Sequence, residues 1–253
     1  MNPSREYKGF TIKLVPDPDP EGPEDWTDDE MYILHYHRQF TRFPEKLGGS
    51  PAPRTGPAYL EWLGEYHYEI PEAEREWYVF PLESYIHGGV VLAFESEGSF
   101  PDRRWDVSRC GSIVMRRKWY EATGTKQTPR EVAETFLKQW NQLLEGDVWG
   151  YEITDAKGTN LTDDDEIDIV WGCYGEEAAY EQAEERIDAY IDEQRDKNDY
   201  SWVTDEMFDN ALEEIVGEMS AGEILGTPGI REVLGEELNN AVLERLEGER
   251  EDA

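Results

Sequence analysis

The sequence predicts an α+β fold in which helices pack on one face of an antiparallel sheet and a helical C-terminal tail follows. Three observations support this prediction. Short β-prone runs, separated by Gly- and Pro-rich stretches, fill the first half of the chain. Apolar residues then recur at helical spacing after Thr128, and further helical stripes close the chain. Strands and helices that are grouped in this way are typical of an antiparallel sheet with segregated helices.

The strand predictions follow alternating or aromatic runs that are bounded by turn residues. His87-Gly88-Gly89 interrupts one long run and indicates a bulge, or a bend at which the strand changes direction. The turn at residues 155–158 predicts a hairpin with a longer second arm. The predicted strands are residues 7–15, 31–40, 77–86, 90–94, 110–115, 148–154 and 167–171.

The helix predictions rest on capping residues and apolar stripes. Thr128-Pro129 has the residue types of an N-cap and a first helical position, and Gly146 ends the same helix. Its stripe consists of Val132, Phe136, Trp140, Leu143 and Leu144. Other helices are predicted near residues 58–62, over residues 176–194, and in two or three segments after residue 201.

Composition shifts divide the chain into three parts. Residues 1–57 are predicted to form a β-rich segment that ends in a Gly- and Pro-rich linker. Residues 58–197 are predicted to form a central α+β domain, and residues 198–253 an acidic helical module.

Charge is the strongest feature of the composition. The chain holds 58 acidic and 24 basic residues, for a net charge of −34. Of these, 30 acids and only 6 bases lie from residue 160 onward. Such a field repels nucleic acids and anionic membranes and attracts basic surfaces. With no signal pattern and no apolar run of roughly 20 residues, we expect a cytoplasmic protein that binds neither nucleic acid nor membrane directly.

The helix predicted over residues 176–194 concentrates this charge. It carries eight carboxylates over roughly 30 Å, or one per roughly 3.7 Å, against about 3.4 Å for one strand of duplex DNA. Salt adaptation or solubility would also explain an acidic surface, but the excess toward the C-terminus favours a dedicated face. The predicted partner-binding residues are Glu177, Glu181, Glu184, Glu185, Asp188 and Asp192, supported by Glu213, Glu214, Glu236 and Glu237.

No motif of an enzyme or of a phosphate-binding loop occurs, so no catalytic residue, metal or cofactor is predicted. His35 and His37 share a strand face but lack a third metal ligand at a diagnostic spacing. The acidic run at residues 163–168 is interpreted as a solvated hairpin arm, since a calcium loop alternates its ligands. Arginines between residues 103 and 117 are interpreted as internal salt-bridge partners. Cys110 and Cys173 are predicted to be buried thiols.

Several landmark runs span most of the chain. They are YKGFTI with DPDPEGPEDW, HYHRQF, FPLESYIHGGVVL, RRWDVSRCGSIVM, LLEGDVWGYEI and DIVWGCYG. With these runs the chain resembles a widespread family of acidic proteins from phages and mobile elements, and its tail EILGTPGIREVLGEELNNAVLERLE resembles a helical module of other phage proteins. The family's common Trp-Asp-Ser-Gly-Gln run is Trp-Asp-Val-Ser-Arg at residues 105–109 here, so no role of its serine or glutamine is carried over. The resemblance implies a phage or mobile-element setting, in which small acidic proteins resemble DNA-mimic inhibitors by charge.

These observations lead to one hypothesis and two alternatives. The hypothesis is a phage-type accessory protein that mimics nucleic acid and inhibits a basic nucleic-acid-binding host protein or defence complex. One alternative is an enzyme or a small-molecule or nucleotide site in the aromatic middle of the chain, and the other is a phage scaffold protein. The alternative pocket would be lined by Tyr85, His87, Trp105, Asp106, Trp171 and Tyr174.

Overall fold

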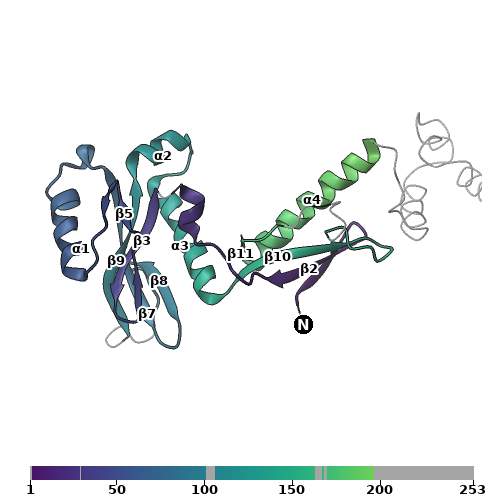
Figure 1. The fold of residues 1–253 in the computed structure, drawn as a ribbon, viewed down its shortest axis with the longest axis horizontal. Coiled ribbons are helices and arrows are strands. Elements are labelled where there is room, and N and C mark those ends of the chain that lie inside the picture. The colour runs from purple at the N-terminus through teal and green to yellow at the C-terminus, as the bar shows by residue number, and fades with distance from the viewer. Residues whose placement is uncertain (1, 29, 101–105, 163–166, 168–169, 197–253) are drawn as a thin grey trace, which may run out of the picture.

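The part of the chain that the structure describes contains two larger antiparallel sheets, one two-stranded sheet and four α-helices, which confirms the predicted α+β class (Figure 1). The structure is a computed structural model that describes residues 2–28, 30–100, 106–162, 167 and 170–196. The helices predicted after residue 201 lie outside these ranges. No helix in the described ranges is long and apolar enough to cross a bilayer.

The larger sheet has five strands in the order β4-β3-β9-β7-β8, all paired antiparallel. Its strands are β3 (Met31–His37), β4 (Phe40–Arg42), β7 (Trp77–Ile86), β8 (Val90–Phe94) and β9 (Val107–Arg116). The prediction of one strand over residues 31–40 is wrong, because the chain turns after His37 and returns as β4. The His87-Gly88-Gly89 run is the turn of the β7–β8 hairpin, in which Gly88 has a φ of 76°.

Helices cover both faces of the larger sheet. Met31 and Ile33 face α3 (Pro129–Glu145), while Tyr32 and Leu34 between them face α1 (Gly56–Leu63). This alternation is the period of two expected of a strand that is buried on both sides. The prediction of helices on one face therefore describes only the smaller sheet.

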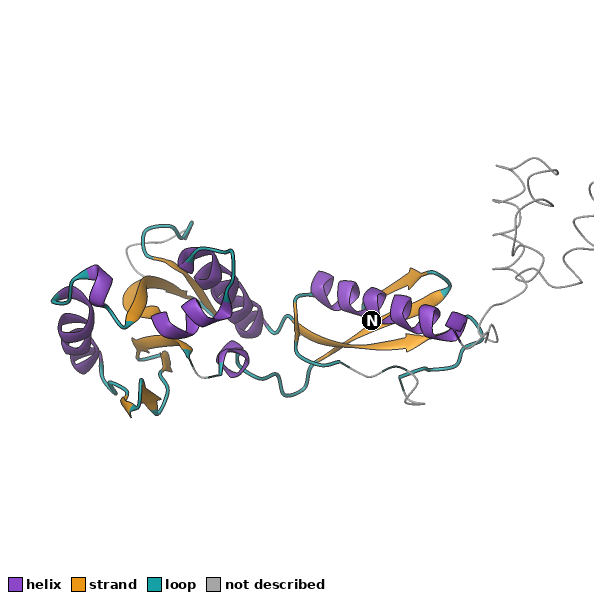
Figure 2. Ribbon diagram, turned by 90° about the horizontal axis from the view of Figure 1, so that it is seen from above, coloured by secondary structure: helices purple, strands orange, loops and turns teal. Residues whose placement is uncertain are grey.

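The smaller sheet has four strands in the order β1-β2-β10-β11. They are β1 (Ser4–Tyr7), β2 (Phe10–Pro16), β10 (Val148–Thr154) and β11 (Cys173–Tyr174). Helix α4 (Glu176–Asp196) covers one face and runs along the strands (Figure 2). The strand predicted over residues 7–15 includes a hairpin turn instead, because Lys8 and Gly9 both take positive φ values.

Short elements complete the described chain. They are the 3-10 helices η1 (Pro23–Thr27) and η3 (Glu72–Glu74), the π-helix η2 (Gly64–Tyr68), helix α2 (Arg117–Thr123), and the strand pair β5 (Lys46–Leu47) and β6 (Ser50–Pro51).

Strand pairing crosses the boundary predicted at residue 57. Residues before it supply β1 and β2 to the smaller sheet and β3 and β4 to the larger one. The chain leaves the smaller sheet after Pro16, builds the larger sheet, and returns as β10 beside β2. The predicted pairing of residues 148–154 with 167–171 is also shifted, since β10 pairs with β11 at residues 173–174.

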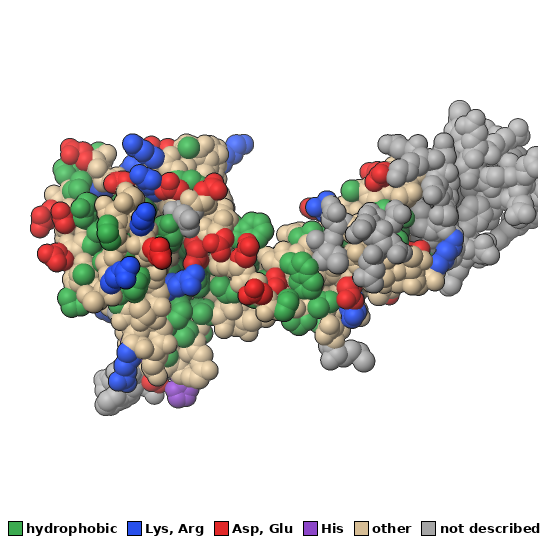
Figure 3. Space-filling view, in the orientation of Figure 1, with side chains coloured by type: hydrophobic (Ala, Val, Ile, Leu, Met, Phe, Trp, Pro, Cys, Tyr) green, Lys and Arg blue, Asp and Glu red, His purple; other side chains and the backbone are tan. Residues whose placement is uncertain are grey.

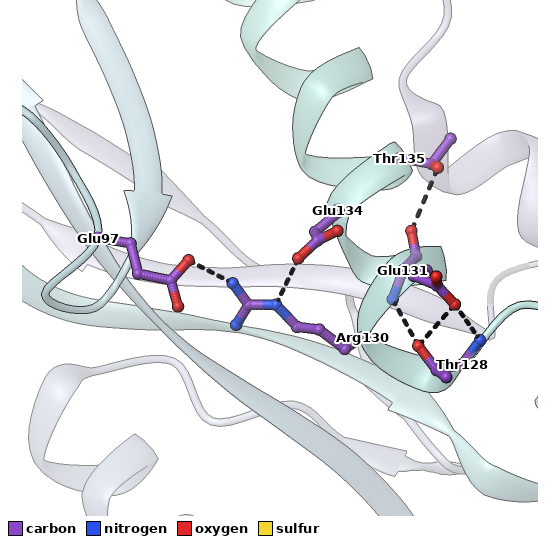
Figure 4. A network of polar contacts seen from close by, with 6 residues as sticks. All are labelled: Glu97, Thr128, Arg130, Glu131, Glu134 and Thr135. Atoms are coloured by element: carbon purple, nitrogen blue, oxygen red, sulfur yellow. Dashed lines mark hydrogen bonds and ion pairs between the residues drawn. The ribbon is translucent and has the colours of Figure 1, made fainter.

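A capping box starts α3, as the Thr128-Pro129 pair predicts (Figure 4). The Thr128 hydroxyl accepts the backbone N–H of Glu131, and the Glu131 carboxylate accepts the backbone N–H of Thr128 at 2.6 Å. These hydrogen bonds hold the pKa of Glu131 below its ordinary value. Arg130, which also lies in the first turn of α3, forms ion pairs with Glu97 and Glu134. The pair with Glu97 connects this turn of the helix to the turn that follows β8.

Thr128→Ala should lower the free energy of unfolding by about 1 kcal/mol, because it removes the acceptor of the Glu131 N–H. Urea denaturation followed by far-UV circular dichroism measures this loss. Thr135→Ala in the same helix is the matched control, because the Thr135 hydroxyl bonds only the Glu131 carbonyl and alanine favours the helix. Equal destabilisation by both substitutions would contradict the assigned cap.

Candidate functional site

Helix α4 has a narrow apolar face and a broad acidic one. Ala179, Ala183 and Ile187 are completely buried against β2 and β10, at the spacing of four residues that defines one helix face. Tyr180 is also buried beside them. At 100° per residue, five of the six predicted carboxylates of α4 fall on the side of the helix away from this apolar face, and Glu184, whose side chain is 26 % exposed, flanks it.

Basic residues of β1 and its turn pair with three of these six carboxylates. Arg5 donates to Glu177 at 2.9 Å and to Glu184 at 3.2 Å, and the Lys8 ammonium lies 2.6 Å from Asp188. The hydrogen bond from Arg5 lowers the pKa of Glu177. The guanidinium of Arg5 also lies 3.9 Å from the ring centre of Tyr180, so a cation–π contact adds to the ion pairs. The predicted acidic face is therefore partly compensated.

The other three carboxylates, those of Glu181, Glu185 and Asp192, lie on the exposed outer side of α4. Glu181 and Glu185 accept no hydrogen bond and form no ion pair with any residue that the structure describes. The four supporting residues, Glu213, Glu214, Glu236 and Glu237, lie outside the described ranges. Glu181 and Glu185 are thus the described carboxylates of the predicted partner-binding face that remain uncompensated.

The five described residues of the alternative pocket are not brought together. Tyr85, His87 and Asp106 cluster at the end of the β7–β8 hairpin, where the rings of Tyr85 and His87 stack and His87 lies 3.4 Å from Asp106. The His87 side chain is 72 % exposed, so this cluster is a surface feature. Tyr174 belongs to β11 of the smaller sheet, Trp171 lies just before that strand, and Trp105 lies outside the described residues.

Trp171 instead lines a different pocket, of about 420 Å³, between the two sheets. Its other lining residues come from the loop after β2, from η1 and from the segment before β11, and they are Asp17, Pro18, Asp19, Glu21, Trp26 and Gly172. We refer to these seven residues as the Trp26–Trp171 pocket. Both tryptophans are unusually exposed, at 63 % for Trp26 and 44 % for Trp171. Acidic and hydrophobic side chains lie beside one another where the two sheets meet (Figure 3).

Two glycines make room for the two indole rings. A Cβ atom on Gly150 would lie 2.3 Å from the Trp171 ring, so this ring rests directly on the β10 backbone. A Cβ atom on Gly172, whose φ is +77°, would lie 3.3 Å from the Trp26 ring. Neither Trp26 nor Gly150 is among the site residues that the sequence predicts. The single tryptophan among the carboxylates of residues 16–30 was the available signal for Trp26, and the pattern of the strand that holds Gly150 gives none.

Hydrogen bonds fix the loop that carries the acidic side of this pocket. The Asp17 carboxylate accepts the backbone N–H groups of Gly172 and Asp19, both at 3.0 Å. The Tyr174 hydroxyl donates to the backbone carbonyl of Glu21 at 2.5 Å. Burial, together with the nearby carboxylates of Glu21, Glu24 and Asp25, raises the pKa of Tyr174 to about 12.

His35 has a structural role in place of the metal site that was considered and not predicted. It is completely buried in the larger sheet, where Nδ1 lies 2.7 Å from the Phe40 carbonyl and Nε2 lies 3.0 Å from the Ser84 hydroxyl. Since the carbonyl only accepts, Nδ1 carries the proton and Nε2 accepts from Ser84. Burial lowers the pKa of His35. Ser84 is equally buried, so this pair is closed to any substrate.

Other candidates from the sequence also have structural explanations. Arg109 pairs with Glu95, and Arg116 pairs with Glu30 and Glu76, as the salt-bridge interpretation predicts. Cys173 is buried, and burial raises the pKa of its thiol to about 11. Among the described residues, no three side chains of His, Cys, Asp or Glu are grouped to hold a metal ion. The acidic run at residues 163–168 lies outside the described ranges apart from Ile167.

No protein-family model matches the chain, and no curated protein or solved structure matches it either. The resemblance to acidic phage and mobile-element proteins therefore stays a prediction that rests on the quoted runs. Function has to be argued from the side chains themselves.

Gly150→Ala should destabilise the protein by roughly 1–3 kcal/mol, because the added methyl group forces the Trp171 ring off the β10 backbone. Urea denaturation measures the loss, and Gly89→Ala is the control because a Cβ atom there meets nothing within 4 Å. A change of less than about 0.5 kcal/mol at Gly150 would contradict the described seat of Trp171.

His35→Gln should flatten the pH dependence of stability between about pH 7 and 5.5. The pKa of His35 is lowered in the folded state, so the unfolded chain binds its proton first as the pH falls below the ordinary value of 6.5. The free energy of unfolding of the wild type therefore decreases as the pH is lowered through this window. The variant lacks the contribution of His35 to this decrease. Urea denaturation at several pH values measures the slope. Ser84→Ala, which keeps the imidazole, should retain it, and a slope unchanged by His35→Gln would refute the prediction.

Proposed function

We propose that this protein acts by binding, and that the outer side of α4 contacts a basic, nucleic-acid-binding host protein and competes with its nucleic acid. The observation that carries the proposal is the pair of outward, uncompensated carboxylates of Glu181 and Glu185, on a helix that is fixed to its sheet by a buried apolar face. A phage or mobile-element setting, as implied by the resemblance, fits a protein of this kind.

Electrostatics explains what such a surface contributes. Charges of one sign on a rigid element accelerate association with an oppositely charged surface, in a manner that salt screens. A helix that is free to rotate would average its charge over all directions. The buried stripe of Ala179, Ala183 and Ile187 prevents this and keeps the acidic side of α4 facing solvent.

The pairing with β1 specifies the kind of mimicry that is proposed. Within residues 176–194 of α4, Arg5, Lys8 and the helix's own Arg186 offset three of the eight negative charges, which leaves five over roughly 30 Å, or one per roughly 6 Å. One strand of duplex DNA has a charge about every 3.4 Å. The proposed partner is therefore recognised by the sign and direction of the field, and not by a replica of phosphate spacing.

Affinity capture from host lysate at two salt concentrations, followed by mass spectrometry, tests the proposal. We expect basic nucleic-acid-binding proteins to be retained at low salt, and to be released at about 1 M salt, where the Debye length is about 3 Å. Duplex DNA or RNA added as competitor should release the same proteins. Retention that survives both treatments would contradict competition for a nucleic-acid groove.

Charge variants locate the contact on the captured protein. Glu181→Gln with Glu185→Gln should slow association about tenfold. Arg5→Gln should instead speed association, because it uncovers the carboxylates of Glu177 and Glu184. Lys13→Gln is the matched control, since it removes one positive charge from a pair with Glu152 on β2 and β10. Stopped-flow association rates measure all three, and equal rates for Arg5→Gln and Lys13→Gln would exclude α4 as the contact.

A further inference from the structure

The Trp26–Trp171 pocket is an open aromatic site with an acidic rim. Two large apolar rings that are 63 % and 44 % exposed are unusual on a protein surface, and here they belong to one pocket. Its volume of about 420 Å³ falls in the range of roughly 300–1,000 Å³ that is common for specific ligand sites. From this arrangement we infer that the pocket receives the guanidinium of an arginine side chain presented by a protein partner.

The rim selects a cation. Asp17, Asp19 and Glu21 line the pocket, and none of the lining residues that the structure describes is basic. The Asp17 carboxylate is occupied by backbone N–H groups. The carboxylates of Asp19 and Glu21 are exposed and accept no hydrogen bond or ion pair from residues that the structure describes. They are therefore available to the N–H groups of a cationic guest, and they repel an anionic one.

The aromatic rings select the kind of cation. An indole face attracts a positive charge more strongly than any other aromatic side chain. The guanidinium is planar and weakly hydrated, so it stacks on an indole while its edge donates to carboxylates. The ammonium of lysine is a compact, strongly hydrated charge that loses more on leaving water. Two indoles beside two available carboxylates therefore favour arginine.

The pocket is held in shape before any guest arrives. Trp171 rests on Gly150, Trp26 packs over Gly172, and Tyr174 anchors the loop at the Glu21 carbonyl. A preformed site avoids part of the ordering cost that binding otherwise carries.

The inference goes beyond the proposed function, because the pocket and the acidic side of α4 lie on opposite faces of the smaller sheet. Helix α4 covers the face of Ile12, Leu14 and Tyr151. Gly150, next to Tyr151 on β10, points to the other face, where Trp171 lies. The two sites share only a preference for positive charge.

The test uses the full chain and three short peptides, acetyl-Gly-Gly-Arg-Gly-Gly-amide and its lysine and citrulline counterparts. Citrulline keeps the shape of arginine and lacks its charge. Indole N–H signals in nuclear magnetic resonance spectra, assigned with Trp26→Phe and Trp171→Phe, report binding. We expect the arginine peptide to shift both pocket signals saturably, the lysine peptide to bind more weakly, and the citrulline peptide weakest of all.

Variants connect this binding to the pocket. Trp26→Ala should weaken the arginine peptide about tenfold. Because Trp26 is mostly exposed, this variant should fold even if Trp171→Ala does not. Tyr68→Ala is the matched control, since Tyr68 is 65 % exposed and lies outside the pocket. The combined Asp19→Asn and Glu21→Gln variant should also bind the arginine peptide more weakly.

Three results would overturn the inference. They are equal affinity for the arginine and citrulline peptides, equal affinity for the arginine and lysine peptides, and an affinity for arginine that Trp26→Ala leaves unchanged. Glu181→Gln with Glu185→Gln should leave the peptide shifts in place. A failure of the α4 contact and a failure of the pocket are therefore separate outcomes.

Discussion

The pairing of β2 with β10 is the interaction on which the rest of the described structure depends. It aligns Ile12 with Ile153 and Leu14 with Tyr151, and these four side chains form the floor on which α4 packs. The same pairing carries β1, and with it Arg5, to the side of α4. On the other face it presents Gly150 to the Trp171 ring. Both candidate sites are thus consequences of one antiparallel contact between distant segments.

Local patterns in the sequence predict local structure well. The capping residues and stripe of α3 and the apolar spacing of α4 each have a cause within a few residues, and both helices form where predicted. The Lys8-Gly9 turn was missed because lysine seldom takes a positive φ, and only the pairing of β1 with β2 imposes it. The spacing of apolar residues predicts strands but not which strands pair. The division of the strands between two larger sheets could therefore not be predicted.

Charge counting also predicts local composition but not which distant residues meet. The composition predicts an acidic α4, but it does not place Arg5, 172 residues before Glu177, against that helix. Compensation of this kind depends on the fold. It makes the net negative charge of α4 smaller than the number of its carboxylates suggests, and it confines the uncompensated charge to the outer side of the helix. The Trp26–Trp171 pocket is a similar case, since its two tryptophans come from segments that meet only where the sheets join. The sequence shows both tryptophans, but it does not show that the fold brings them into one pocket.

The larger sheet is an insertion between two neighbouring strands of the smaller one, and this governs the order in which the protein is completed during synthesis. Residues 17–147 must leave the ribosome before β10 is available to β2. The backbone N–H of Asp17 bonds the carbonyl of Val148, so a folded insertion brings its own two ends together and shortens the loop that β2 and β10 have to close. Until then, the nascent chain exposes one side of β2 as an unpaired edge, which is the period when it most needs protection from aggregation.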